Sequence, residues 1–186
     1  LQVLLQQDPR DSKVLDQLIT ALASLHSNRK IWLLCKQYEG KIFSASSVMH
    51  GAHACYEIGD FKRSVHFVEK LLDGDPANAN ALMLRGNIAV AGKQFAKAIA
   101  DYEKVLEIMP NSLEALSNLS NSKSFLCDWA DRETEVNQLN TVSKKAPGKL
   151  GLFEVSGLQL DEASEFHNAL AKSKIFNTRV KLLREK

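Results

Sequence analysis

The residues 125–132 read Phe-Leu-Cys-Asp-Trp-Ala-Asp-Arg and place a thiol beside a carboxylate and an indole. A nucleophilic cysteine needs a neighbouring base or a positive environment that stabilises its thiolate. Asp128 has the opposite effect on Cys127, because a negative neighbour disfavours a second negative charge. We therefore expect Cys127 to be a buried structural cysteine.

His50 and His53 lie three residues apart, a spacing that would let both imidazoles donate to one metal ion from a helix. The sequence offers no third ligand at a suitable spacing, so we expect a groove-facing or partly buried pair. Gly86 and Gly92 fit a repeat pattern rather than a phosphate-binding loop. We predict no catalytic residue, no metal site and no cofactor, and hence a chain that is not itself an enzyme.

The composition is typical of a soluble globular protein, with 45% hydrophobic and 25% charged residues among 186. The formal charge of +2 arises from 24 basic and 22 acidic residues spread along the chain, without the basic stripe of a nucleic-acid-binding protein. No apolar run approaches the roughly 18 residues that span a bilayer, and no signal peptide is visible. Three widely spaced cysteines favour reduced thiols. We expect a cytoplasmic protein that binds neither nucleic acid nor membrane.

Two segments of the chain repeat one another. Residues 59–76, GDFKRSVHFVEKLLDGDP, and residues 92–110, GKQFAKAIADYEKVLEIMP, both read turn, aromatic residue, small residue, apolar helix and proline, with a one-residue shift at the start. Pro76 and Pro110 are 34 residues apart. This period and order of residues are typical of the tetratricopeptide repeat, a pair of antiparallel helices.

Each residue type in the repeat has a physical role. Gly92 ends a helix, Phe95 is expected to wedge between the two helices of the pair, and Ala98 lies where they cross, since a larger side chain there would overpack. Asp60 and Ser112 are predicted helix caps.

We predict an all-α fold, a right-handed tetratricopeptide-repeat superhelix of antiparallel helix pairs followed by a C-terminal linker and helix. Residues 1–44 form degenerate N-terminal repeat helices that turn at Ser27-Asn28, and residues 45–112 form two regular repeats. Residues 113–146 form a divergent last repeat, and residues 147–186 form the linker and terminal helix. Stacking of neighbouring pairs supplies the core.

In the last repeat, Cys127-Asp128-Trp129 falls on the turn between the two helices. We expect Asp128 to cap the second helix and Trp129 to be the wedge. Arg132 occupies the position of the small crossing residue, and no proline closes the unit before Pro147. The series of repeats is therefore expected to end here.

The segment EALSNLSNSKSFLCDWADRETEV (114–136) resembles the last repeat of O-GlcNAc-transferase-like proteins, in which an Ala-x-x-Asn-Leu helix precedes Cys-Asp-Trp. Residues 146–176 resemble the linker of bacterial members. In that family the repeats precede a two-lobed glycosyltransferase that uses UDP-sugars. The resemblance implies that this chain, which opens within a helical pattern, is part of a longer protein whose catalytic lobes follow Lys186.

The repeat geometry also predicts a concave groove lined by the first helix of each pair. A mixture of methionine and polar side chains there is adaptable and suits an extended or helical peptide. The other interpretation is a concave face that is simply solvated. The predicted groove residues are Met49, His53, Tyr56, Asn80, Met83, Asn87, Asn118 and Asn121.

The sequence therefore predicts a module that binds a protein or peptide partner, as the repeat region of an O-GlcNAc-transferase-like glycosyltransferase. The alternative is a stand-alone tetratricopeptide scaffold with no linked transferase. The sequence leaves the identity of the partner and any self-association open.

Overall fold

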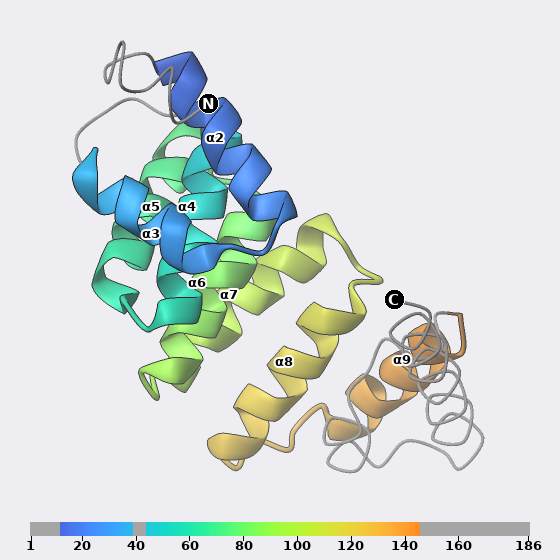
Figure 1. Ribbon diagram of the computed structural model, residues 1–186. Coiled ribbons are helices and arrows are strands. Elements are labelled where there is room, and N and C mark those ends of the chain that lie inside the picture. The colour runs from blue at the N-terminus through green and yellow to red at the C-terminus, as the bar shows by residue number, and fades with distance from the viewer. Residues whose placement is uncertain (1–11, 39–43, 146–186) are drawn as a thin grey trace, which may run out of the picture. The chain divides into compact units, whose positions relative to one another are not determined.

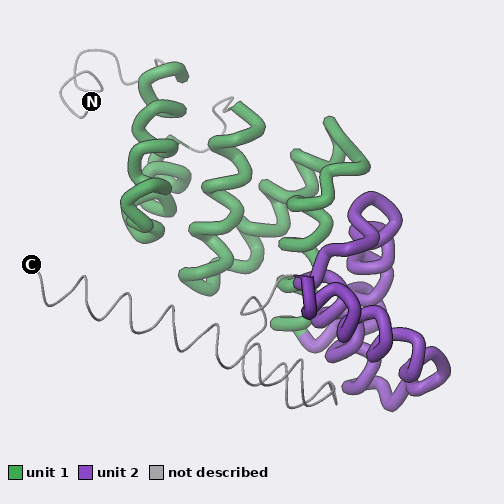
Figure 2. The backbone as a smooth tube through the Cα atoms, turned by 90° about the vertical axis from the view of Figure 1, so that its right-hand side faces the viewer, with its two compact units in different colours: residues 1–92 green, residues 93–186 purple. Residues whose placement is uncertain are grey.

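The computed structural model describes residues 12–38 and 44–145, and these residues form eight α-helices without a β-strand (Figure 1). The chain divides into two compact units, residues 1–92 and 93–186 (Figure 2). The first contains α2 (Ser12–Ser24), α3 (Asn28–Gln37), α4 (Ala45–Ile58), α5 (Phe61–Gly74) and α6 (Ala79–Ala91). The second contains α7 (Phe95–Ile108), α8 (Leu113–Phe125) and α9 (Arg132–Lys145).

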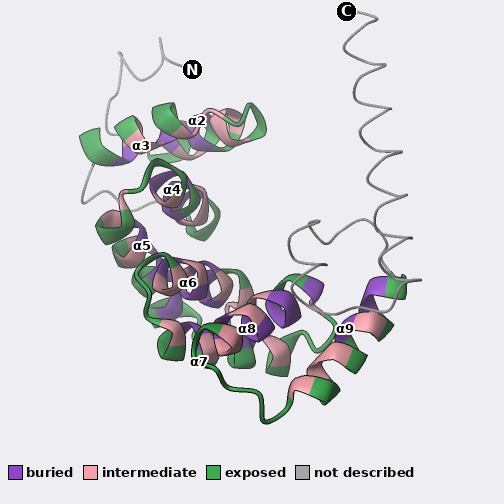
Figure 3. Cartoon of the chain, turned by 90° about the horizontal axis from the view of Figure 1, so that it is seen from below, coloured by how far each residue is buried: buried purple, intermediate pink, exposed green. Residues whose placement is uncertain are grey.

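The first unit has two layers of helices. Helix α4 packs against α2, α3, α5 and α6. Figure 3 shows α3 and α5 on one side of this unit and α2, α4 and α6 on the other. Helices that alternate along the chain therefore share a layer, and α4 and α6 are neighbours within one of them.

Small residues allow the close packing around α4. Ser64 of α5 is fully buried, and its hydroxyl donates a hydrogen bond to the carbonyl oxygen of Ala52 at 2.8 Å. A Cβ atom added to Gly51 would lie 2.9 Å from Sγ of Cys35 on α3. The approach of α3 and α5 to α4 thus depends on the small side chains at these crossings.

The helix ends follow the predicted caps. The carboxylate of Asp60 accepts a hydrogen bond from the backbone N–H of Arg63 at the start of α5, and the Ser112 hydroxyl accepts one from Ala115 at the start of α8. Helix α4 ends at Ile58 with Gly59 as its C-cap at φ +86°, a left-handed conformation that glycine adopts without steric cost. Helix α6 ends at Ala91 with Gly92 as its C-cap, as predicted.

The second unit is held by an apolar core and by polar contacts between α8 and α9. Its core cluster comprises Leu113, Leu116, Leu139 and Val142, with Leu106 packed against it. Between the last turn of α8 and the first turn of α9, Nζ of Lys123 lies 2.7 Å from Oε1 of Glu135, and this hydrogen bond is the largest cause of a raised pKa at Lys123. Nη1 of Arg132 donates to Oγ of Ser120 at 2.5 Å, so the large residue at the crossing position reaches across to α8 through its guanidinium group.

The turn between α8 and α9 differs from its prediction. Trp129 is 53% exposed, with the guanidinium carbon of Arg132 5.6 Å from its ring centroid, so its assignment as a buried wedge is wrong. Cys127 is exposed rather than buried and has φ at +55°. Asp128 does not cap α9, because its Oδ1 accepts from the backbone N–H of Ala130 and the helix begins only at Arg132.

The length of this turn explains the difference. Only Gly59 and Asp60 separate α4 from α5, and Phe61 is then the first residue of its helix, as Phe95 is in α7. Residues 126–131 separate α8 from α9, and Trp129 lies within that connection instead of at the start of the helix. The ring stacked on Phe95 is Phe125, with ring centroids 4.6 Å apart.

Candidate functional site

The first unit carries six of the eight predicted groove residues on two neighbouring helices. Met49, His53 and Tyr56 are four and three residues apart on α4, a spacing that places them on one helix face. Asn80, Met83 and Asn87 have the equivalent spacing on α6. Because α4 and α6 contact each other in the same layer, the two sets belong to adjacent helices of one face.

These six side chains differ in exposure. His53 and Asn80 are exposed, whereas Met49, Tyr56, Met83 and Asn87 are half-buried. Tyr56 also packs its ring against Phe61, with centroids 5.9 Å apart. The face is therefore a mixed surface in which the half-buried side chains are supported by the fold and the exposed ones are accessible to solvent.

The other two predicted residues, Asn118 and Asn121, lie three residues apart on α8 in the second unit. Both are half-buried, and the backbone carbonyl of Asn118 accepts a hydrogen bond from the Ser122 hydroxyl at 2.7 Å. The structure describes this pair within its own unit, and a groove continuous with α4 and α6 remains a prediction.

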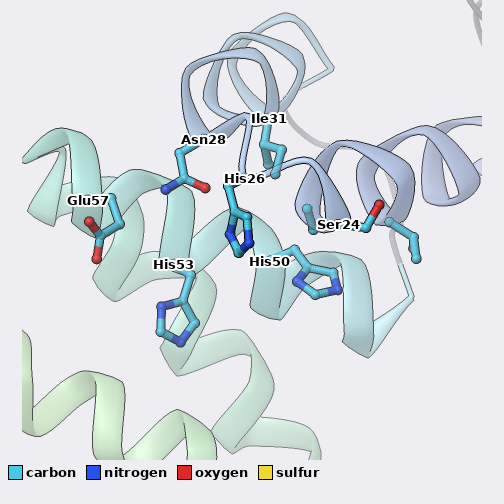
Figure 4. A pocket seen from close by; sticks show the side chains of 9 residues that line it. Ser24, His26, Asn28, Ile31, His50, His53 and Glu57 are labelled. Atoms are coloured by element: carbon cyan, nitrogen blue, oxygen red, sulfur yellow. The ribbon is translucent and has the colours of Figure 1, made fainter. Parts of the chain in front are cut away.

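A cavity of about 650 Å³ opens in the first unit between the end of α2, the start of α3 and one side of α4 (Figure 4). It brings His53 together with His50 on the same helix and with His26, which lies in the turn between α2 and α3. The cavity is lined by Thr20, Ala23, Ser24, His26, Asn28, Ile31, His50, His53 and Glu57.

The sequence did not indicate His26 as a member of this site. It lies one residue before the predicted Ser27-Asn28 turn, and 24 positions before His50, so no local spacing joins it to the other two histidines. Its backbone has φ at +50°. The signal that could have found it was the turn itself, since the residues that connect α2 to α3 come near the neighbouring pair in a stacked helical repeat.

Within residues 12–38 and 44–145, no group of three or more histidine, cysteine, aspartate or glutamate side chains is arranged to hold a metal ion. His50 is half-buried and His53 is exposed, in keeping with a pair that faces the cavity. The arrangement offers imidazoles, hydroxyls and an amide as hydrogen-bonding groups.

The thiols of the first unit are poorly suited to chemistry. Burial raises the pKa of Cys35 to about 11 and that of Cys55 to about 12. Both side chains are buried, so neither offers an accessible thiolate near neutral pH. Nucleophilic chemistry is disfavoured at these two positions.

The comparison with protein families bears on the segment that carries α6 and α7. Residues 79–112 match the model of the tetratricopeptide repeat. The fold is a tetratricopeptide-repeat fold. This confirms the predicted all-α class, and the matched tetratricopeptide segment includes Asn80, Met83 and Asn87.

Solved structures with the same tetratricopeptide fold support this. The crystal structure of MamA protein has a TM-score of 0.63 and 14% identity, over 84% of this chain and 81% of that one. MamA from Desulfovibrio magneticus RS-1, from residue 41 to its end, has a TM-score of 0.58 and 15% identity, over 94% and 96% of the two chains. At sequence identities of 14% and 15%, the similarity to these structures shows the fold alone.

No curated protein matches the sequence. None of the helices in the described part of the chain is long and apolar enough to cross a membrane.

Proposed function

We propose that this chain is a protein-interaction module that binds a partner peptide on the face of α4 and α6. The observation that carries the proposal is the presence of two sets of polar and methionine side chains, at one-face spacing, on neighbouring helices of one layer. Tetratricopeptide and related repeats use the surface formed by successive units to bind extended partners. Binding is the role that we propose for that surface.

The chemistry of the face suits a peptide. Met49 and Met83 are flexible and polarisable, and they can adapt to apolar side chains of different shapes. Asn80 and Asn87 carry amides that can both donate to and accept from a peptide backbone. Asn118 and Asn121 on α8 carry the same amide chemistry, and we propose that they contact a partner within the second unit.

The proposal is tested with peptides selected from a displayed random library on the purified chain. Their affinities are then measured by calorimetry for the chain and for the double variant Met83→Glu with Asn87→Ala. We expect the double variant to bind at least about tenfold more weakly, because it places a charge in the apolar part of the face and removes an amide.

Leu33→Glu is the matched control, since Leu33 is exposed on α3 in the other layer and its replacement also puts a negative charge in place of an apolar side chain. Circular dichroism establishes that each variant remains folded. Equal affinity of the double variant and the unchanged chain would place the binding surface elsewhere.

A finer proposal concerns the longer protein. We propose that the module is the repeat region of an O-GlcNAc-transferase-like glycosyltransferase and presents substrates to catalytic lobes. The support is the Ala-x-x-Asn-Leu helix followed by Cys-Asp-Trp at residues 115–129, together with the linker-like segment 146–176. Reading the gene beyond the codon for Lys186 tests it, since two glycosyltransferase lobes are required there.

The alternative is a stand-alone scaffold, which the generic character of the repeats before residue 114 favours. A stop codon after Lys186 would support the scaffold and exclude the linked transferase. A cytoplasmic location is part of both proposals and rests on the three widely spaced cysteines. Cell fractionation of the tagged protein tests it, and recovery in a secreted fraction would contradict it.

A further inference from the structure

We propose that the cavity lined by His26, His50 and His53 binds an acidic side chain of the partner peptide, more tightly as the pH falls. This inference rests on the proposed function and adds a partner chemistry to it. The cavity lies on α4, the helix that also carries Met49 and Tyr56, so a peptide on that face can reach it. The imidazoles come from two separate elements, the α2–α3 turn and α4 (Figure 4).

The lining combines hydrogen-bond donors with an apolar wall. The amide of Asn28 and the imidazoles can each donate to a carboxylate oxygen. The hydroxyls of Thr20 and Ser24 already donate to the carbonyl oxygens of Asp16 at 2.9 Å and Ala21 at 2.8 Å. Ala23 and Ile31 supply the apolar part of the wall. The volume of about 650 Å³ lies within the range of ligand cavities, about 300–1,000 Å³, and has room for a side chain rather than a bare ion alone.

The charge of the lining changes sign with protonation. Its titratable groups are the three imidazoles and the carboxylate of Glu57, which carry −1 when all three imidazoles are neutral and +2 when all three are protonated. Helices α2 and α3 contribute no other titratable group to the lining, and α5 and α6, which pack against α4, contribute none. Histidine is the side chain that commonly changes charge between about pH 5 and 8. A carboxylate ligand is therefore repelled at higher pH and attracted at lower pH.

The turn that carries His26 is held in place before any ligand binds. The backbone N–H of His26 donates to Ala23 at 3.0 Å, and that of Ser27 donates to Leu22 at 2.9 Å. With φ at +50°, His26 occupies the left-handed region and directs its side chain toward the cavity (Figure 4). The α4 helix sets the positions of the Cα atoms of His50 and His53. Such preorganisation reduces the entropy lost on binding.

The experiment follows the histidine ring resonances by ¹H–¹³C NMR. The probe is a blocked Gly-Glu-Glu-Gly peptide, and its neutral counterpart is blocked Gly-Gln-Gln-Gly. We expect the Glu peptide to shift the resonances of His26, His50 and His53, with a dissociation constant at least about fivefold smaller near pH 5.5 than near pH 7.5. His66 is the internal control, because it lies on α5 beside Phe67 and does not line the cavity.

Variants separate charge from shape. Glu57→Gln removes the negative group and is expected to tighten binding of the Glu peptide near pH 7.5. His50→Gln with His53→Gln is expected to abolish most of the pH dependence. His26→Asn is the suitable change in the turn, since asparagine tolerates a positive φ.

Three outcomes would overturn the inference. Equal shifts with the Gln peptide would exclude recognition of a carboxylate, and shifts of His66 as large as those in the cavity would indicate non-specific binding. Inorganic phosphate that shifts the three resonances while the Glu peptide does not would assign the cavity to phosphate. Library-selected peptides that lose affinity with Met83→Glu and Asn87→Ala, but not with the histidine variants, would leave the proposed function standing and remove the cavity from it.

Discussion

The indole Nε1 of Trp32 donates a hydrogen bond to Oδ2 of Asp60 at 2.9 Å and joins α3 to the beginning of α5. The same carboxylate caps α5 through the backbone N–H of Arg63 and forms an ion pair with the Arg63 guanidinium group. Together these contacts hold the pKa of Asp60 below its usual range, and the hydrogen bond from Trp32 is the largest cause.

Trp32→Phe is expected to raise the pKa of Asp60 toward the ordinary value and to lower the free energy of unfolding by about 1–3 kcal/mol, because a hydrogen bond to a charged acceptor is lost. A lowered carboxyl pKa stabilises the fold above the unfolded pKa, and that stability is lost as the pH falls through the folded pKa. The variant should therefore lose less stability than the unchanged chain on acidification below about pH 4. NMR titration of the Asp60 carboxyl carbon measures the shift.

Trp129→Phe is the matched control for that titration, since the exposed Trp129 lies in the second unit. An Asp60 titration curve unchanged by Trp32→Phe would show that the indole does not set this pKa.

Gly51→Ala is expected to destabilise the protein by about 1–3 kcal/mol through overpacking, less the gain in helix propensity. The added Cβ would lie 2.9 Å from Sγ of Cys35 and 3.4 Å from Cε2 of Phe67, both side chains of neighbouring helices. Removing the sulfur with Cys35→Ala should relieve most of the clash, so the cost of Gly51→Ala should fall in that background. Urea denaturation of the four proteins in the cycle gives the coupling, and additive costs would contradict the contact.

One fast-reacting thiol is expected among the three cysteines. Cys127 is exposed, whereas Cys35 and Cys55 are buried, with pKa values raised to about 11 and about 12. Iodoacetamide on the native protein near neutral pH should add a single carbamidomethyl group, located at Cys127 by peptide mass spectrometry. Cys127→Ser should abolish the rapid phase, and rapid labelling of Cys55 would contradict its buried position.

Trp129→Ala is expected to cost less than about 1 kcal/mol, because the ring is 53% exposed and loses mainly its contact with Arg132. Leu139→Ala should cost about 2–5 kcal/mol, since this fully buried side chain belongs to the core between α8 and α9. Both are measured by urea denaturation. A larger cost for Trp129 than for Leu139 would restore the tryptophan as the wedge of the last repeat.

Much of the fold could be predicted because the repeat carries its own local signals. The spacing from Pro76 to Pro110, the caps at Asp60 and Ser112 and the helix end at Gly92 each act over a few residues of chain. The small residue predicted at the helix crossing, Ala98, is fully buried. These features depend on hydrogen bonds and steric contacts within or between adjacent helices.

The turn at Cys127 illustrates where the same reasoning failed. The order Cys-Asp-Trp matched the repeat, but its distance from the next helix did not, and α9 begins only at Arg132. The position of an aromatic residue relative to the start of its helix decides whether its ring packs between the two helices of a pair. Because six residues connect α8 to α9, Trp129 lies before the helix and its ring stays outside the interface. The aromatic contact formed instead between Phe95 and Phe125.

The sequence by itself determined the all-α repeat architecture, the helix caps and the spacing of the candidate groove residues, because local chain geometry specifies them. Tertiary structure decided which groups from different helices meet. It placed His26 with His50 and His53 around one cavity and Trp32 against Asp60. It also left Trp129 and Cys127 accessible to solvent. Burial and contact between distant residues depend on how helices pack, and the order of residues along one helix does not encode that packing locally.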